Sequence, residues 1–131
     1  MSTGESQRDR LREVARKDTV IVIVSKHAIS RFRERKVDKY YGPEERLIEN
    51  IVVNTLRSGK VLVERSSFLV IASRYALACT VDERRVIIVK TVMRASDVLP
   101  KLEDRARKLR KSPFSGKNMV AILPRIRGGR E

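Results

Sequence analysis

Four short apolar segments, separated by connections of only a few residues, constrain this chain more than any other feature. They span residues 60–64, 67–73, 75–81 and 85–93 and are rich in valine, isoleucine and leucine, which favours β-strands. Connections this short leave no room for a crossover, so consecutive strands should pair antiparallel. The polar connection Asp82-Glu83-Arg84 is typical of a hairpin turn.

A fifth strand is expected at Val20–Val24, where every residue is apolar and β-branched. A run that is apolar on both alternating faces indicates a strand buried on both sides and away from the sheet edge. We therefore predict an α+β fold with a mostly antiparallel sheet of about five strands and helices packed on one face.

Four helices are expected around this sheet. The segment 44–57 follows the helical period, with Gly59 just beyond its end. A short N-terminal helix is predicted at 5–17 and a second at 25–36, with Ser25 as a candidate N-cap. A basic C-terminal helix at 96–111 has only a thin apolar stripe. We predict a single α+β domain over 1–111 and a basic C-terminal extension over 112–131.

The charge balance points to a polyanionic partner. The chain carries 30 Lys and Arg against 16 Asp and Glu, a formal net charge of +14, which favours RNA or DNA. From Leu99 onward there are ten basic and three acidic residues, and phosphate contact is expected there. The expected nucleic-acid-binding residues are Lys101, Arg105, Lys108, Arg110, Lys111, Lys117, Arg125, Arg127 and Arg130. An anionic membrane is the weaker alternative because the apolar stripe is narrow and lacks tryptophan.

Several classes of protein are excluded by composition. With one cysteine, Cys79, and one histidine, His27, the chain cannot form an internal disulfide or the usual zinc site. Cys79 alternates with Tyr75, Leu77 and Val81 and is expected in the core. We expect no metal and no cofactor. The N-terminus lacks the apolar core of a signal peptide, and no apolar run is long enough to cross a membrane. These features predict a soluble, cytoplasmic protein, and scarce amide residues with 35% charged residues indicate a thermophilic source.

The segment after Val20–Val24 contains the candidate catalytic residues. His27, Arg31 and Arg35 follow at i, i+4 and i+8, which places them on one face of a helix. A metal-independent ribonuclease needs a proton carrier and cations at the phosphate. His27 suits the first role, and the two arginines suit the second. Glu34 or Tyr75 is the candidate for a second proton carrier. The alternative is a capping or packing histidine beside a solvated helix face.

A motif in the same segment resembles a known family. The residues from His27 to Arg35 read H-A-I-S-R-F-R-E-R. They resemble the small HAxxRxxxR-motif domains of unknown function that are associated with the RelE/ParE-like toxin fold. The resemblance covers about residues 19–93. It implies a toxin of the ribonuclease type with an antitoxin-like partner protein, although some members of that fold are gyrase poisons or binding modules. The basic C-terminus departs from this pattern.

A second interpretation of function needs no catalysis. The basic excess also suits a structural or regulatory DNA- or RNA-binding protein of viral or chromosomal type. The apolar segment Met119–Leu123 either adds an edge strand or docks on a second copy of the chain, so a homodimer is a further expectation.

Overall fold

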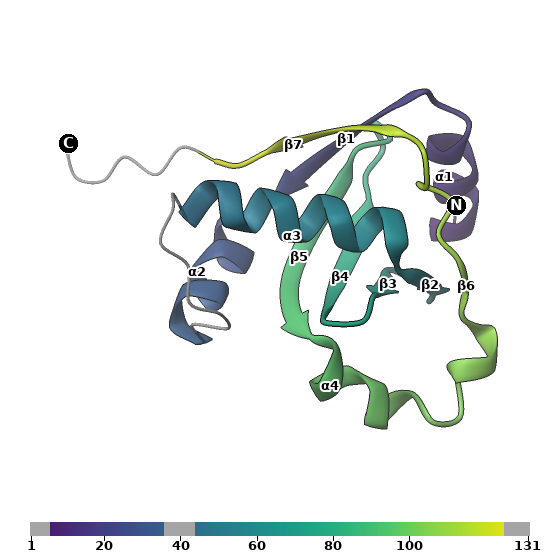
Figure 1. The fold of residues 1–131 in the computed structure, drawn as a ribbon. Coiled ribbons are helices and arrows are strands. Elements are labelled where there is room, and N and C mark those ends of the chain that lie inside the picture. The colour runs from purple at the N-terminus through teal and green to yellow at the C-terminus, as the bar shows by residue number, and fades with distance from the viewer. Residues whose placement is uncertain (1–5, 36–43, 125–131) are drawn as a thin grey trace.

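Figure 1 shows the order of the helices and strands along the chain in a computed structural model that describes residues 6–35 and 44–124. The helices are α1 (Gln7–Ala15), α2 (Lys26–Arg35), α3 (Glu44–Ser58) and α4 (Ala95–Val98), with 3-10 turns η1 (Leu99–Leu102) and η2 (Ala106–Lys108). The strands are β1 (Thr19–Val24), β2 (Lys60–Val63), β3 (Phe68–Ile71), β4 (Tyr75–Val81), β5 (Ile87–Arg94), β6 (Arg110–Lys111) and β7 (Asn118–Ile122).

The sheet is mixed, with the strand order β6-β2-β3-β4-β5-β1-β7. The five expected strands are all present, and β2 to β5 form the expected antiparallel meander. The α+β class is therefore confirmed, but the sheet has seven strands in the described residues instead of about five. β1 lies parallel to both β5 and β7, because long connections with helices separate these strands in the sequence.

The sheet curls strongly around α3 (Figure 1). β6 and β7 are at opposite edges of the strand order, yet only residues 112–117 join them. A connection this short spans at most about 25 Å, so the two edges must approach each other. Within this connection, Phe114 is fully buried among core residues, and Ser112 donates a hydrogen bond to the carbonyl of Leu56. The sheet and the core therefore continue past the predicted boundary at 111–112 as far as β7.

Two clusters of apolar side chains lie on opposite faces of the sheet. The larger cluster, which we call the main core, contains Ile48, Val52 and Leu56 of α3 together with alternate residues of the strands. The smaller cluster joins Val98 and Leu102, from α4 and η1, to the other face of β2–β5. The prediction of helices on one face is therefore wrong, since α4 and η1 cover the face opposite α3.

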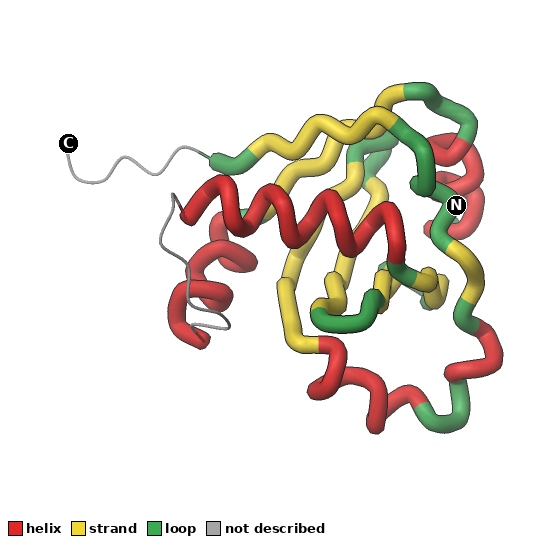
Figure 2. The backbone as a smooth tube through the Cα atoms, in the orientation of Figure 1, coloured by secondary structure: helices red, strands yellow, loops and turns green. Residues whose placement is uncertain are grey.

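The predicted helix at 96–111 is replaced by α4, η1, η2 and β6. Figure 2 shows a first helical stretch, a loop, a second short helical stretch and then a strand. Pro100 lacks the N–H that a continuing helix would need and clashes with the preceding turn. Leu99 is 47% exposed, so the apolar stripe is too thin to hold a long helix against the sheet. Basic residues from Arg105 to Lys111 would also repel one another at helical spacing.

β1 lies between two other strands, which confirms that it is not at an edge. Val20, Val22 and Val24 are buried in the main core. The prediction of burial on both faces is wrong, because Ile21 is 41% exposed. Only the face toward α3 is fully covered.

Candidate nucleic-acid interface

A cleft of about 390 Å³ lies between α1, the edge of β2 and the segment around β6. We call it the cationic cleft because five of its lining residues are basic and none is acidic. The basic residues are Arg8, Arg12, Lys108, Arg110 and Lys111. The remaining wall is apolar and is formed by Leu11, Ala15, Val61, Leu62, Val63 and Pro113.

The position of α1 is set by contacts on the side away from the cleft. The amide of Gln7 donates to the Val81 carbonyl (3.1 Å) and accepts from the Val81 N–H (2.8 Å), as a neighbouring strand would. Arg10 donates to the same carbonyl (2.9 Å). Arg8 and Arg12, one helical turn apart, consequently line the cleft from a helix that is fixed to β4.

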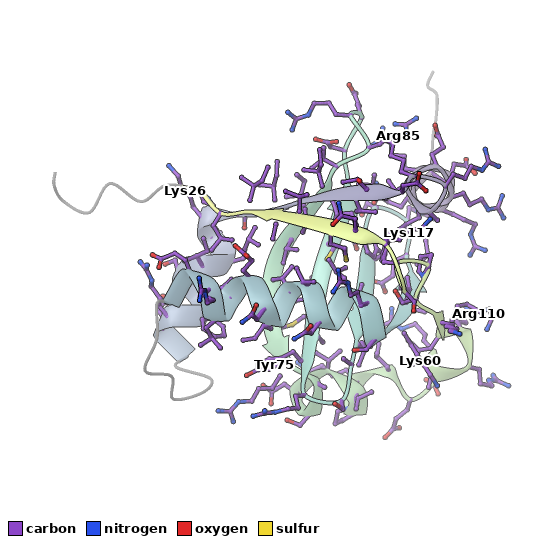
Figure 3. All side chains as sticks on the ribbon, turned by 45° about the horizontal axis from the view of Figure 1, so that its top comes forward. Lys26, Lys60, Tyr75, Arg85, Arg110 and Lys117 are labelled. Carbon is purple, nitrogen blue, oxygen red and sulfur yellow. The ribbon has the colours of Figure 1, made fainter. Side chains whose placement is uncertain are left out.

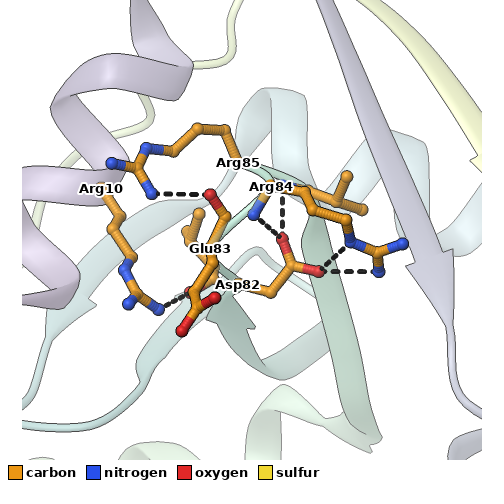
Figure 4. Close-up of polar contacts among 7 residues, drawn as sticks. Arg10, Asp82, Glu83, Arg84 and Arg85 are labelled. Atoms are coloured by element: carbon orange, nitrogen blue, oxygen red, sulfur yellow. Dashed lines mark hydrogen bonds and ion pairs between the residues drawn. The ribbon is translucent and has the colours of Figure 1, made fainter.

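The β4–β5 hairpin that receives α1 is itself stiffened by polar contacts (Figure 4). Asp82 accepts hydrogen bonds from the N–H groups of Arg84 (2.9 Å) and Val86 (3.1 Å), and it pairs with the Arg84 guanidinium at 2.8 Å. Partial desolvation acts to raise the pKa of Asp82, but these hydrogen bonds and the nearby positive charge outweigh it and lower the pKa.

Arg85 adds a second link between this hairpin and α1. It has a left-handed backbone with a φ of 65°, which costs a non-glycine residue about 1–2 kcal/mol. Its guanidinium donates to the Glu83 carbonyl (2.9 Å) and pairs with Glu13 of α1 at 2.9 Å. The hairpin therefore holds α1 through both its backbone and its side chains.

The opposite wall of the cleft is the edge formed by β2 and β6. Lys111 lies directly opposite Lys60, and Arg110 opposite Val61; Figure 3 shows Lys60 and Arg110 at the same end of the molecule. Like charges on directly opposed residues of two strands are destabilising. β6 pairs with Lys60 and Val61 alone, so it leaves the β2 edge at Leu62 and Val63 to line the cleft.

This arrangement can bind anions but offers no catalytic pair. Guanidinium and ammonium groups donate charge-assisted hydrogen bonds to phosphate oxygens. The cleft lining contains no histidine, cysteine or carboxylate, so it has no general base or metal ligand of the usual kinds. Elsewhere in the described residues, no group of three or more His, Cys, Asp or Glu side chains could hold a metal ion.

The structure brings together only part of the predicted nucleic-acid-binding set. Lys108, Arg110 and Lys111 line the cationic cleft. Lys101 and Arg105 instead line a separate cavity of about 630 Å³ beside α4 and η1, and Arg105 pairs with Glu64.

Further along the chain, Lys117 is partly buried, and its carbonyl accepts a hydrogen bond from Arg57 (3.2 Å). Arg125, Arg127 and Arg130 lie outside the described residues.

Arg8 and Arg12 were missed by the sequence interpretation. Their spacing of four residues places them on one helix face. Leu11 lies between the two arginines in the sequence, and Ala15 follows Arg12. This signal is visible in the sequence, but the partner wall is about 100 residues away, and nothing local indicates that the two segments meet.

The predicted catalytic residues lie elsewhere. His27 and Arg31 are exposed on α2, while Ala28, Ile29 and Phe32 of the same helix are buried. The Ser25 hydroxyl accepts from the Ala28 N–H (3.0 Å), which confirms Ser25 as a helix cap. The side chain of Arg35 is outside the described part of the structure.

α2 is at the opposite end of the molecule from the cationic cleft. In Figure 3, Lys26 at the start of α2 is far from Arg110 and also from Tyr75. Tyr75, a candidate second proton carrier, is 9% exposed within the main core, and the Arg74 guanidinium lies 5.8 Å from its ring centre. The structure therefore does not bring Tyr75 beside His27.

Comparison with known proteins adds no family to these observations. No family model matches the chain, and neither a curated protein nor a solved structure matches it. In the residues that the structure describes, no helix combines the length and apolar character needed to span a membrane.

Proposed function

We propose that this protein binds nucleic acid through the cationic cleft. One observation carries the proposal: five basic side chains from two distant segments line a single cleft that contains no carboxylate. Uncompensated positive charge destabilises a folded chain, and an anion bound in the cleft would relieve this repulsion. A polymer of phosphates is the anion that also suits the net charge of +14.

The cleft fits a nucleic-acid backbone better than a small carboxylate ligand. Its basic groups come from α1 on one side and from η2 and β6 on the other, so they can contact phosphates along both walls. The apolar residues between them can receive a sugar or a base. Each phosphate contact releases condensed counterions, so binding should weaken steeply as salt is raised.

The test compares two double variants that remove the same charge. Arg8→Ala with Arg12→Ala removes one wall of the cleft, and Arg16→Ala with Arg46→Ala removes two exposed arginines outside it. Fluorescence anisotropy with labelled single-stranded RNA, single-stranded DNA and duplex DNA should show about tenfold or greater weakening for the cleft variant alone. Equal weakening by both variants would assign the binding to net charge and not to the cleft.

The contribution of the basic C-terminal extension to binding needs a separate test by deletion. Removing residues 112–131 would also remove β7 and the buried Phe114, so loss of binding would not be informative. Deleting residues 125–131 leaves every described element intact and tests the contribution of Arg125, Arg127 and Arg130.

A second candidate function is a metal-independent ribonuclease of toxin type centred on α2. It is favoured by the exposure of His27 and Arg31 one turn apart and by the resemblance of the motif to the RelE/ParE-like domains. An antitoxin-like partner and a cytoplasmic location belong to the same proposal.

RNA incubated with the protein in the presence of a chelator tests this second candidate. The expected result is cleavage that His27→Ala abolishes without weakening binding, because the cleft is at the other end of the molecule. Undiminished cleavage by His27→Ala would remove His27 from the mechanism, and absence of cleavage by the unchanged protein would leave binding as its activity.

A further inference from the structure

Exposed apolar side chains gather on the outer face of β1 and β7. Among the described residues, four large hydrophobic side chains are markedly exposed, and three of them lie here: Ile21 (41%), Val120 (43%) and Ile122 (47%). The parallel register places Ile21 beside Val120, and Ile23 beside Ile122. We call this surface the outer β1–β7 face.

The outer β1–β7 face has no charge. Neither β1 (TVIVIV) nor β7 (NMVAI) contains a charged residue, although 35% of the whole chain is charged. β7 has β1 as its one strand neighbour in the described sheet, and edge strands are commonly protected by charges or by being very short. The other edge strand, β6, is both charged and very short, because it consists of Arg110 and Lys111. The edge strand β7 contains no charged residue.

We propose that a second copy of this chain covers the outer β1–β7 face. Two chains with a net charge of +14 repel each other, so contact between two copies costs least at a surface that carries no charge. An acidic partner would find no basic residue on these two strands. Two open sheet faces, by contrast, can stack about 10 Å apart, as the sheets of a β-sandwich do.

A self-complementary patch of this kind predicts a two-fold dimer, with each Val120 packed against the partner's patch. Salt should strengthen this dimer, because it screens the repulsion between the positively charged copies. The opposite salt dependence is expected for nucleic-acid binding. The dimer does not depend on the proposed nucleic-acid function, and it can form in the absence of any ligand.

Sedimentation equilibrium of the full chain, freed of nucleic acid at high salt, tests the proposal. The unchanged protein should approach twice its 15.1 kDa mass as concentration and salt increase. Val120→Lys should remain monomeric, and Ile122→Thr, which keeps the β-branched side chain of a strand, should weaken the dimer. Leu99→Lys is the matched control, because Leu99 is 47% exposed on η1, away from this face, and that variant should dimerise normally.

Three results would overturn the proposal. The first is a mass of 15.1 kDa at every concentration and salt. The second is a dimer that persists in Val120→Lys and in Ile122→Thr. The third is equal loss of the dimer in Leu99→Lys. Circular dichroism of each variant separates loss of the dimer from loss of the fold.

Discussion

Asp82 links a local turn to the position of the cationic cleft. Its carboxylate accepts two backbone N–H groups and the Arg84 guanidinium within the β4–β5 turn. The same hairpin supplies Val81 and Arg85, which hold α1. A change in one turn carboxylate is therefore expected to affect stability in a way that depends on pH.

The variant Asp82→Asn should be less stable than the unchanged protein at neutral pH, by about 0.5–1 kcal/mol for a largely surface-exposed ion pair. Because folding lowers the pKa of Asp82 below its ordinary value of 3.8, its stabilising contribution is present above that value. It is lost as the pH falls through the lower pKa of the folded state. Urea unfolding across this range should show the difference shrinking toward acid pH.

Glu83→Gln is the control for this prediction. Glu83 is an exposed neighbour, and the hydrogen bond from Arg85 is accepted by its backbone carbonyl and not by its carboxylate. A difference between Asp82→Asn and the unchanged protein that stayed constant down to strongly acid pH would contradict the assigned role of the carboxylate.

Gly59 is required by a close approach between α3 and the sheet. A Cβ atom at this position would lie 2.7 Å from the Thr55 carbonyl oxygen and 2.8 Å from Val70 Cγ1. Gly59→Ala should therefore lower the free energy of unfolding by about 1–3 kcal/mol through overpacking. Thermal unfolding measures the change, with Gly116→Ala as the comparison.

Gly116 has a φ of +80°, and a Cβ atom added to it would meet nothing within 4 Å beyond its two chain neighbours. Gly116→Ala should lower the free energy of unfolding by only about 1–2 kcal/mol, which is the cost of a left-handed backbone at a residue with a Cβ atom. Equal stability of Gly59→Ala and the unchanged protein would show that α3 can move away from β3 at no cost.

At the scale of the elements, α1 is joined to β4 by the buried side chain of Gln7. Gln7 is buried and satisfies both the N–H and the carbonyl of Val81. In Gln7→Leu the carbonyl keeps Arg10 as its donor, but the buried N–H loses its acceptor. We expect a loss of about 1–3 kcal/mol in the free energy of unfolding.

Chemical denaturation of Gln7→Leu should be compared with Arg8→Leu, an exposed change at the next residue that should stay within about 0.5 kcal/mol of the unchanged protein. Nucleic-acid affinity should also fall in Gln7→Leu, since Arg8 and Arg12 lose their fixed position. Unchanged stability would mean that α1 is held by Arg10 and Glu13 without Gln7.

The sequence predicts those elements whose signal is local. The apolar run Val20–Val24 and the alternating segments of β2 to β5 were located correctly, because strand period and turn residues are read from neighbouring positions. The helical period of α3 and the Ser25 cap of α2 were found for the same reason. Cys79 was expected in the core, where burial raises its pKa.

Features that depend on distant contacts could not be predicted. The parallel pairing of β7 with β1 joins residues about 100 positions apart, and no local pattern encodes it. The residues after Ala95 retain enough helical spacing to suggest one long helix, but Pro100 and the exposed Leu99 break it. The meeting of Arg8 and Arg12 with Lys108, which creates the cleft, follows only from the complete topology.

At the scale of the whole molecule, two of the three surfaces lie at opposite ends. The cationic cleft lies at the end formed by α1 and β6, and α2 with His27 lies at the other end (Figure 3). The outer β1–β7 face is uncharged. The proposed nucleic-acid binding and the proposed chemistry on α2 can therefore be altered one at a time by substitution.

The salt dependence of binding tests most directly whether nucleic acid occupies the cationic cleft. The slope of log affinity against log salt reports the number of phosphates neutralised, about 0.9 per contact on duplex DNA. We predict that Arg8→Ala with Arg12→Ala reduces the steepness of this slope by about two contacts, whereas Arg16→Ala with Arg46→Ala leaves it unchanged. Equal slopes for the cleft variant and the unchanged protein would show that nucleic acid does not occupy the cationic cleft.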